Sequence, residues 1–130
     1  MSDPVDLTPA LSDPDAGPAL AAAAEGRLLL ARCLACGEAH HYPRTPCPFC
    51  GSADLEHLDA RGTGRIYSFS VTHGGRDPWV IAYVTLDEGP TLMTNVIDTP
   101  HDEIAIGERV ELVMRPTPHG IHAPFFRRQP

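Results

Sequence analysis

The chain has four cysteines, and their spacing is typical of a metal site. They form two Cys-x-x-Cys pairs, Cys33 with Cys36 and Cys47 with Cys50, separated by ten residues. Zn²⁺ binds four thiolates tetrahedrally at about 2.3 Å, and two tight turns can each supply two sulfurs. The sequence therefore predicts that these four cysteines bind one metal ion.

The residues beside the pairs favour a structural zinc site. Gly37 and Gly51 directly follow the two pairs, and glycine adopts the positive φ that lets backbone N–H groups turn towards the sulfurs. Four cysteine ligands complete the coordination sphere and leave no position for a substrate. We predict one structural Zn²⁺ per chain, whose binding folds a segment too small to fold alone.

Two other uses of the cysteines compete with zinc. A rubredoxin-like iron site uses the same four thiolates, so the sequence does not separate iron from zinc. Thioredoxin-like redox chemistry needs a single pair at a helix N-terminus and fits less well.

His40 and His41 lie between the pairs, but four thiolates already satisfy a metal ion. We interpret both histidines as surface or packing residues.

The sequence contains no convincing set of catalytic groups. The sequence has no Gly-x-Ser-x-Gly motif and no cysteine outside the two pairs, so the usual signatures of a nucleophile are missing. The acidic pairs at 87–88 and 102–103 lie at expected strand ends or loops. Solvated turns explain them better than acid–base chemistry, and we assign no catalytic residue.

One loop, residues 72–79, is a candidate contact region. It combines His73, Arg76 and the lone tryptophan, Trp79, with two glycines. An arginine beside an aromatic ring can hold a phosphate and stack on a base, as a nucleotide or coenzyme A requires. We predict these three residues as ligand or partner contacts. Composition alone favours a simpler interpretation, a flexible hairpin tip with Trp79 packed against the barrel.

The C-terminal end offers a second candidate contact patch. Arg127 and Arg128 directly follow Phe125 and Phe126. Cationic and aromatic side chains side by side could contact the same class of ligand. The simpler interpretation is a loose tail.

The elements that must position these residues are short and mainly β. Alanine-rich residues 18–26 predict a short helix that Gly26 can end. Residues 27–33 could form a strand that leads into the first cysteine, and 99–108 could contain a helical turn. Five further strands are predicted by alternating, β-branched and aromatic residues, over 65–73, 79–89, 91–98, 109–116 and 122–128. In the first of these, strict alternation places Tyr67, Phe69 and Val71 on one face.

Together these elements predict three parts. Residues 1–26 form a flexible N-terminal segment with the short helix, 27–58 form a rubredoxin-like zinc ribbon, and 59–130 form a five-stranded β-barrel. Five short antiparallel strands fit an OB-like or an SH3-like barrel, and periodicity alone does not separate the two. The expected fold class is mainly β.

Charge and hydropathy restrict the class of function. The 130-residue chain has a net charge of −7, and all ten basic residues are arginine, which disfavours nonspecific nucleic-acid binding. No apolar run approaches the length of a membrane span. The acidic first residues lack the features of a secretory signal. We expect a cytoplasmic protein, in which reduced thiols bind metal rather than form disulfides.

The order of these features resembles a known family, the zinc-ribbon plus OB-fold proteins called domain of unknown function thirty-five. The matching segments cover much of residues 26–126, namely 32–52, 62–73, 80–98 and 106–114. The resemblance implies an OB barrel after the ribbon. The chain departs from the family at its front, where an alanine-rich run replaces a longer helix with aromatic residues.

The resemblance also implies a function. Family members accompany thiolases, thiolase-like aldolases or enoyl-CoA hydratases in lipid, steroid or aromatic acyl-CoA metabolism. The chain is then expected to be a non-catalytic accessory subunit of a thiolase-like enzyme in a hetero-oligomer. It would help to assemble the complex and to shape acyl-CoA binding.

Two other functions compete with this expectation. Zinc ribbons and OB barrels also occur in single-stranded nucleic-acid binders, but residues 59–130 contain seven arginines against nine acidic residues. A free-standing enzyme acting on an acyl-CoA through His73 or His122 is the least favoured function.

Overall fold

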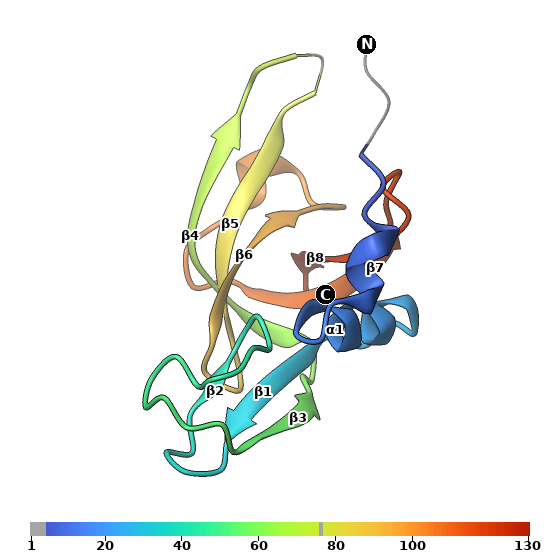
Figure 1. The fold of residues 1–130 in the computed structure, drawn as a ribbon. Coiled ribbons are helices and arrows are strands. Elements are labelled where there is room, and N and C mark those ends of the chain that lie inside the picture. Colours follow the sequence, from blue (N-terminus) through green and yellow to red (C-terminus); the bar gives the residue numbers. More distant parts are fainter. Residues whose placement is uncertain (1–4, 76) are drawn as a thin grey trace. The chain divides into compact units, whose positions relative to one another are not determined.

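The computed structural model describes residues 5–75 and 77–130. These residues form two compact units, one of the described residues up to 60 with 114–123, the other of 61–113 with 124–130. No helix in the described part of the chain is long and apolar enough to cross a membrane. The elements, labelled in Figure 1, are η1 (Thr8–Ser12), α1 (Ala16–Ala24), β1 (Leu29–Cys33), β2 (Ala39–His40), β3 (Leu55–Asp59), β4 (Thr63–Thr72), β5 (Trp79–Leu86), β6 (Thr91–Val96), η2 (His101–Glu103), β7 (Arg109–Pro116) and β8 (His122–Arg128).

The first unit is built around β1. This strand is the centre of a three-stranded antiparallel sheet with the order β2-β1-β3. Its apolar side chains are buried, and Leu29 packs with Ala19 and Ala22 of α1. An alanine-rich helix can approach a sheet closely because its side chains are small, so α1 covers β1 despite having only nine residues.

The helix begins earlier than the sequence predicts. It covers Ala16–Ala24 rather than 18–26, because the Asp13 carboxylate accepts the backbone N–H groups of Asp15 and Ala16, both at 2.8 Å. Acceptors of this kind satisfy the free amides of a first helical turn. The preceding residues, which the sequence predicts to be flexible, form η1, and the Leu7 N–H donates to the His119 carbonyl at 2.8 Å.

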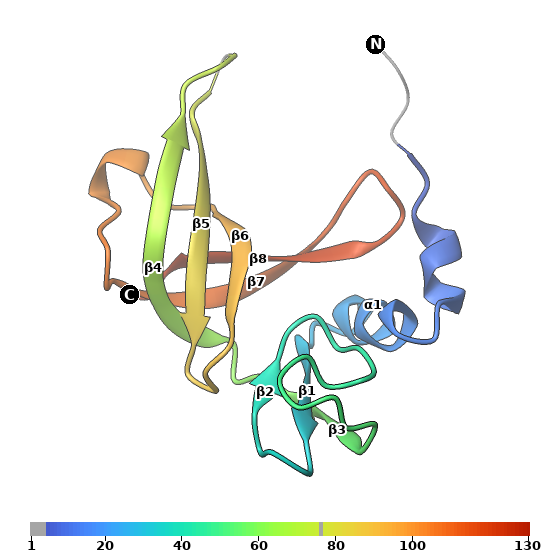
Figure 2. The same ribbon diagram turned by 60° about the vertical axis from the view of Figure 1, so that its left-hand side comes forward.

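The second unit is a closed five-stranded barrel with the order β4-β5-β6-β8-β7. Strand β4 pairs antiparallel with both β5 and β7. The parallel pair Val96 and Phe126 joins β6 to β8. A simple meander has only antiparallel neighbours, so this parallel closure indicates the partly Greek-key path of an OB fold. The predicted mainly β fold with an OB barrel is confirmed, and Figure 2 shows its strands from a second side.

The barrel core follows the alternation of the strands, with one exception. Inward-facing side chains of β5 and β6 are buried, and Phe126 of β8 is fully enclosed. In β4, however, the register shifts between Ile66 and Ser68. A β-bulge of this kind gives one extra residue to one strand. Tyr67 is therefore 68% exposed while Phe69 pairs with the buried Ala82, and the prediction that Tyr67 shares a face with Phe69 and Val71 is wrong.

An ion pair connects two barrel strands with the turn after β5. The Arg109 guanidinium of β7 donates two hydrogen bonds to Asp87, at 2.7 and 3.0 Å. The Thr63 hydroxyl of β4 donates to the same carboxylate. The Arg109 hydrogen bonds, followed by that of Thr63, hold the pKa of Asp87 well below its usual range.

Replacing Asp87 with asparagine is expected to lower the free energy of unfolding by about 1 kcal/mol at pH 7, the upper end for a partly exposed pair. The pKa of Asp87 is lower in the folded state than in the unfolded chain, where it is about 4. The stabilisation is therefore present above about pH 4 and is lost as the pH falls towards the folded-state pKa. Urea unfolding at pH 7 and pH 3 measures it.

The control for this variant is Glu103→Gln, because that carboxylate lies 4.0 Å from Arg128 in a more exposed pair. It should leave stability nearly unchanged at both pH values. The difference between wild type and Asp87→Asn should shrink at pH 3. A loss of equal size at both pH values would contradict an electrostatic origin.

Candidate metal centre

Two turns of nearly identical geometry present the four cysteines. The backbone N–H of Gly37 donates to the Cys33 carbonyl at 2.8 Å, and that of Gly51 donates to the Cys47 carbonyl at 2.9 Å. Both glycines have a positive φ, of 79° and 80°, which explains why glycine stands at these two positions. The two turns are therefore zinc-knuckle-like loops, one after β1 and one before β3.

Backbone amides also point at the sulfurs. The N–H of Cys36 donates to Cys33 Sγ at 3.5 Å, and the N–H of Phe49 donates to Cys47 Sγ at 3.4 Å. Cys33 and Cys47 are buried, whereas Cys36 and Cys50 are exposed. Each turn thus supplies one buried and one exposed thiol, with amide donors arranged to stabilise sulfur in its anionic form.

The four Sγ atoms converge on one point. They all lie within 4.8 Å of one another, and they are the only group of three or more candidate metal-ligating side chains in the described part of the chain. Cys33 and Cys50 have their sulfurs 3.5 Å apart, and Cys36 and Cys47 have theirs 3.8 Å apart. A tetrahedral ion with bonds of about 2.3 Å separates its sulfur ligands by about 3.8 Å. The cluster is therefore consistent with one bound metal ion.

The ionisation of the thiols shows why a cation suits this cluster. The amide of Cys36 is the main cause that lowers the pKa of Cys33 to about 7. For Cys36, the backbone N–H of Glu38 lowers the pKa, but partial desolvation of its sulfur and the neighbouring thiols outweigh it and raise the pKa to about 12. The negative charge of one thiolate thus disfavours deprotonation of the next thiol. A divalent cation bound between them would offset this repulsion.

The two histidines between the turns lie outside the sulfur cluster. His40 is buried, and its Nε2 lies 3.2 Å from the Arg44 carbonyl oxygen, to which it donates. Its ring contacts Phe49 edge-on, at 6.4 Å between centroids. Burial, with Arg44 and His40 as neighbours, lowers the pKa of His41 to about 4. Both histidines are therefore packing residues of the ribbon, as the sequence interpretation has it.

The candidate contact residues of the 72–79 loop lie in the second unit, and those that the structure describes are exposed. His73 is exposed, and its ring lies edge-on against that of His101, with centroids 5.7 Å apart. Trp79 begins β5 and is 46% exposed, so it is neither fully packed against the barrel nor free in solvent. Trp79 and His101 line one cavity of about 340 Å³. Arg76 lies outside the described residues. No local signal in the sequence pointed to His101.

The C-terminal patch is not formed as the sequence suggested. Phe126 is fully buried in the barrel, because its strand closes the sheet against β6. Arg127 donates through Nε to Glu111 at 2.9 Å. The arginines therefore do not lie beside two exposed aromatic rings, and the prediction of a combined cationic and aromatic patch is wrong.

Both units match a described protein family. Residues 20–56 match the family described as "ChsH2, rubredoxin-like zinc ribbon domain". Residues 58–115 match the one described as "ChsH2, C-terminal OB-fold domain". A solved structure described as "Ltp2-ChsH2(DUF35) aldolase" contains a chain that is 36% identical, with a TM-score of 0.79, over 89% of this chain and 95% of that one.

Two curated relatives extend these similarities. A "DUF35 domain-containing scaffold protein" of Methanothermobacter thermautotrophicus is 38% identical over 91 residues, which cover 65% of this chain and 68% of the relative. A "Probable enoyl-CoA hydratase alpha subunit" of Thermomonospora curvata is 39% identical over 111 residues, 82% of this chain. The match spans only 35% of that longer relative.

Proposed function

Because the chain belongs to the ChsH2 (DUF35) family, we propose that it is a non-catalytic accessory subunit of a thiolase-like enzyme. The enzyme would be an aldolase or thiolase that makes or breaks carbon–carbon bonds of acyl-CoA thioesters. The substrates would belong to lipid, steroid or aromatic acyl-CoA metabolism. The complex is proposed to be cytoplasmic, where cysteine thiols stay reduced.

One observation carries this proposal. A chain from a solved aldolase complex matches both units of this one, over 95% of its own length and at 36% identity. A match over both units extends the similarity beyond a shared barrel, which by itself says little about function. The scaffold proteins among the relatives point the same way.

The chemistry of the cysteine site supports a structural role. Cys33, Cys36, Cys47 and Cys50 are proposed to hold one Zn²⁺ that joins the two turns. Bound there, the ion would supply folding free energy rather than an open coordination position. The reactive groups would therefore belong to the thiolase-like subunit, while this chain would assemble the complex and help to shape acyl-CoA binding.

Co-expression with the thiolase-like proteins of the same genome tests the proposal. One of them is expected to co-purify with this chain as a hetero-oligomer of defined mass in light scattering. The complex should turn over a 3-hydroxyacyl- or 3-ketoacyl-CoA thioester from a panel, at a rate at least about 100-fold above that of either protein alone.

The matched control replaces this chain by an unrelated OB-fold protein, which should give neither complex nor activity. If every thiolase-like protein of the genome is fully active alone and none co-purifies with this chain, the proposal is wrong. Turnover by this chain alone would equally contradict a non-catalytic role.

A further inference from the structure

Four large side chains point to solvent from the second unit. Tyr67, Trp79, Tyr83 and Met93 are 68%, 46%, 47% and 65% exposed. They belong to the adjacent strands β4, β5 and β6. We call the outward surface of these three strands the aromatic face.

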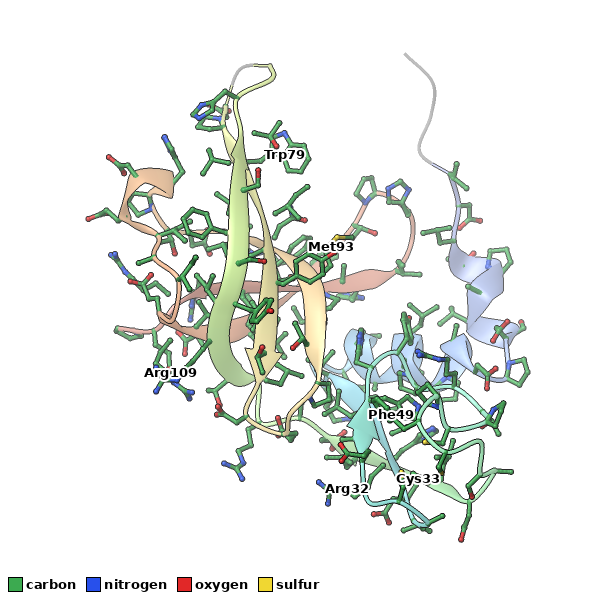
Figure 3. All side chains as sticks on the ribbon, turned by 90° about the vertical axis from the view of Figure 1, so that its left-hand side faces the viewer. Arg32, Cys33, Phe49, Trp79, Met93 and Arg109 are labelled. Atoms are coloured by element: carbon green, nitrogen blue, oxygen red, sulfur yellow. The ribbon has the colours of Figure 1, made fainter. Side chains whose placement is uncertain are left out.

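The strand register brings these side chains together. Tyr83 pairs with Met93 across β5 and β6, and with Ser68 on β4, directly after Tyr67. Directly opposite residues in a sheet have neighbouring side chains on the same face. Trp79 and Met93 line one shallow groove of about 170 Å³, together with Ile81 and Asn95. In Figure 3, Trp79 and Met93 lie on the same side of these strands.

The aromatic face is almost free of charge. Its outward positions, all within the described residues, hold one arginine and no acidic residue, namely Arg65, Tyr67, Ser68, Ser70, Thr72, Trp79, Ile81, Tyr83, Thr85, Thr91, Met93 and Asn95. The whole chain, in contrast, has 17 acidic residues and a net charge of −7. Aromatic residues and methionine are enriched, and acidic residues depleted, at the centres of protein–protein interfaces.

The exposed area is large enough for such a centre. A fully exposed aromatic or methionine side chain offers roughly 200 Å², so these four expose on the order of 500 Å². Monomers rarely expose a larger contiguous apolar patch unless it is functional. One side of a stable interface covers about 800 Å², which the surrounding serine, threonine and asparagine side chains would complete.

We propose that the aromatic face is the docking surface for the thiolase-like subunit, through an apolar and uncharged area on that subunit. The inference rests on the proposed function. Nucleic acid or an anionic membrane would require cations here, and the face has only Arg65. A second copy of this chain would bring two acidic proteins together, which their net charge opposes.

The test introduces one charge at the centre of the face. Met93→Asp and Tyr83→Asp are expected to weaken binding of the thiolase-like protein that co-purifies with wild type by about 100-fold, because each buries an unpaired carboxylate. Ile106→Asp is the matched control, since Ile106 is 70% exposed on the same unit but lies outside the aromatic face. It should change affinity less than about threefold.

Titration calorimetry gives the affinities, and circular dichroism with thermal unfolding shows that each variant is folded. If wild type and both aromatic-face variants bind equally, this inference is wrong while the proposed function stands. If no thiolase-like protein binds wild type, the proposed function fails and this inference with it. A wild-type homodimer that Met93→Asp dissociates, or salt-sensitive binding of a single-stranded oligonucleotide that it abolishes, would assign the face to another occupant and overturn the inference.

Discussion

Replacing Cys47 with serine is expected to reduce the metal content from one ion per chain to less than about a tenth of that. The Cys47 side chain is 2% exposed and its sulfur lies 3.8 Å from that of Cys36. A hydroxyl is a poor ligand for zinc, and three remaining thiolates leave the coordination sphere open. Metal analysis by mass spectrometry of wild type and variant measures the loss, and it also identifies the ion in wild type, for which we expect zinc rather than iron.

The same variant should loosen the ribbon. Strands β2 and β3 pair with β1, but β2 has only two residues. So small a sheet has little apolar area to bury, and we expect it to depend on the ion proposed to join its turns. Hydrogen exchange should therefore become faster at the amides of 29–59. The amides of β4, β5 and β6 should keep their protection, because the barrel has its own core.

The matched control for Cys47→Ser is His57→Ser, which introduces the same residue at an exposed position of β3. It should keep its metal and its amide protection. An unchanged metal content in Cys47→Ser would contradict the assignment of the four ligands. A metal-free ribbon with its amide protection intact would contradict the structural role of the ion.

The convergence of the four cysteines could be predicted from the sequence because neighbouring residues specify each half of the cluster. Two cysteines three residues apart in a turn with a following glycine specify one half of the site, as the equivalent bonds of Gly37 and Gly51 show. Strands β2 and β3 carry no comparable signal. Ala39–His40 is too short for alternation, and Leu55–Asp59 exposes most of its side chains. Both exist because β1 offers them backbone partners.

The barrel strands could also be predicted, but the aromatic face could not. Alternation in Val80, Ala82 and Val84 identifies the inward side of β5 directly. The bulge in β4 turns Tyr67 outward against the local pattern. Whether Tyr83 and Met93 are neighbours depends on the pairing register, which arises from long-range contacts and not from either strand alone. The candidate docking surface could therefore be identified only from the structure.

Replacing Phe126 with alanine is expected to destabilise the barrel by about 3–5 kcal/mol, a large part of the roughly 5–15 kcal/mol of a whole domain. Phe126 is fully buried, and its carbonyl accepts the Ile97 N–H at 2.8 Å where β8 closes the barrel on β6. Urea unfolding followed by the fluorescence of Trp79, the lone tryptophan, reports on this unit.

Phe125→Ala is the control, because the Phe125 side chain is only partly buried. This variant should lose less than about half as much stability as Phe126→Ala. Since a shift of one residue exchanges the two faces of a strand, a larger cost at Phe125 would mean that β8 pairs in another register and that the barrel closes differently.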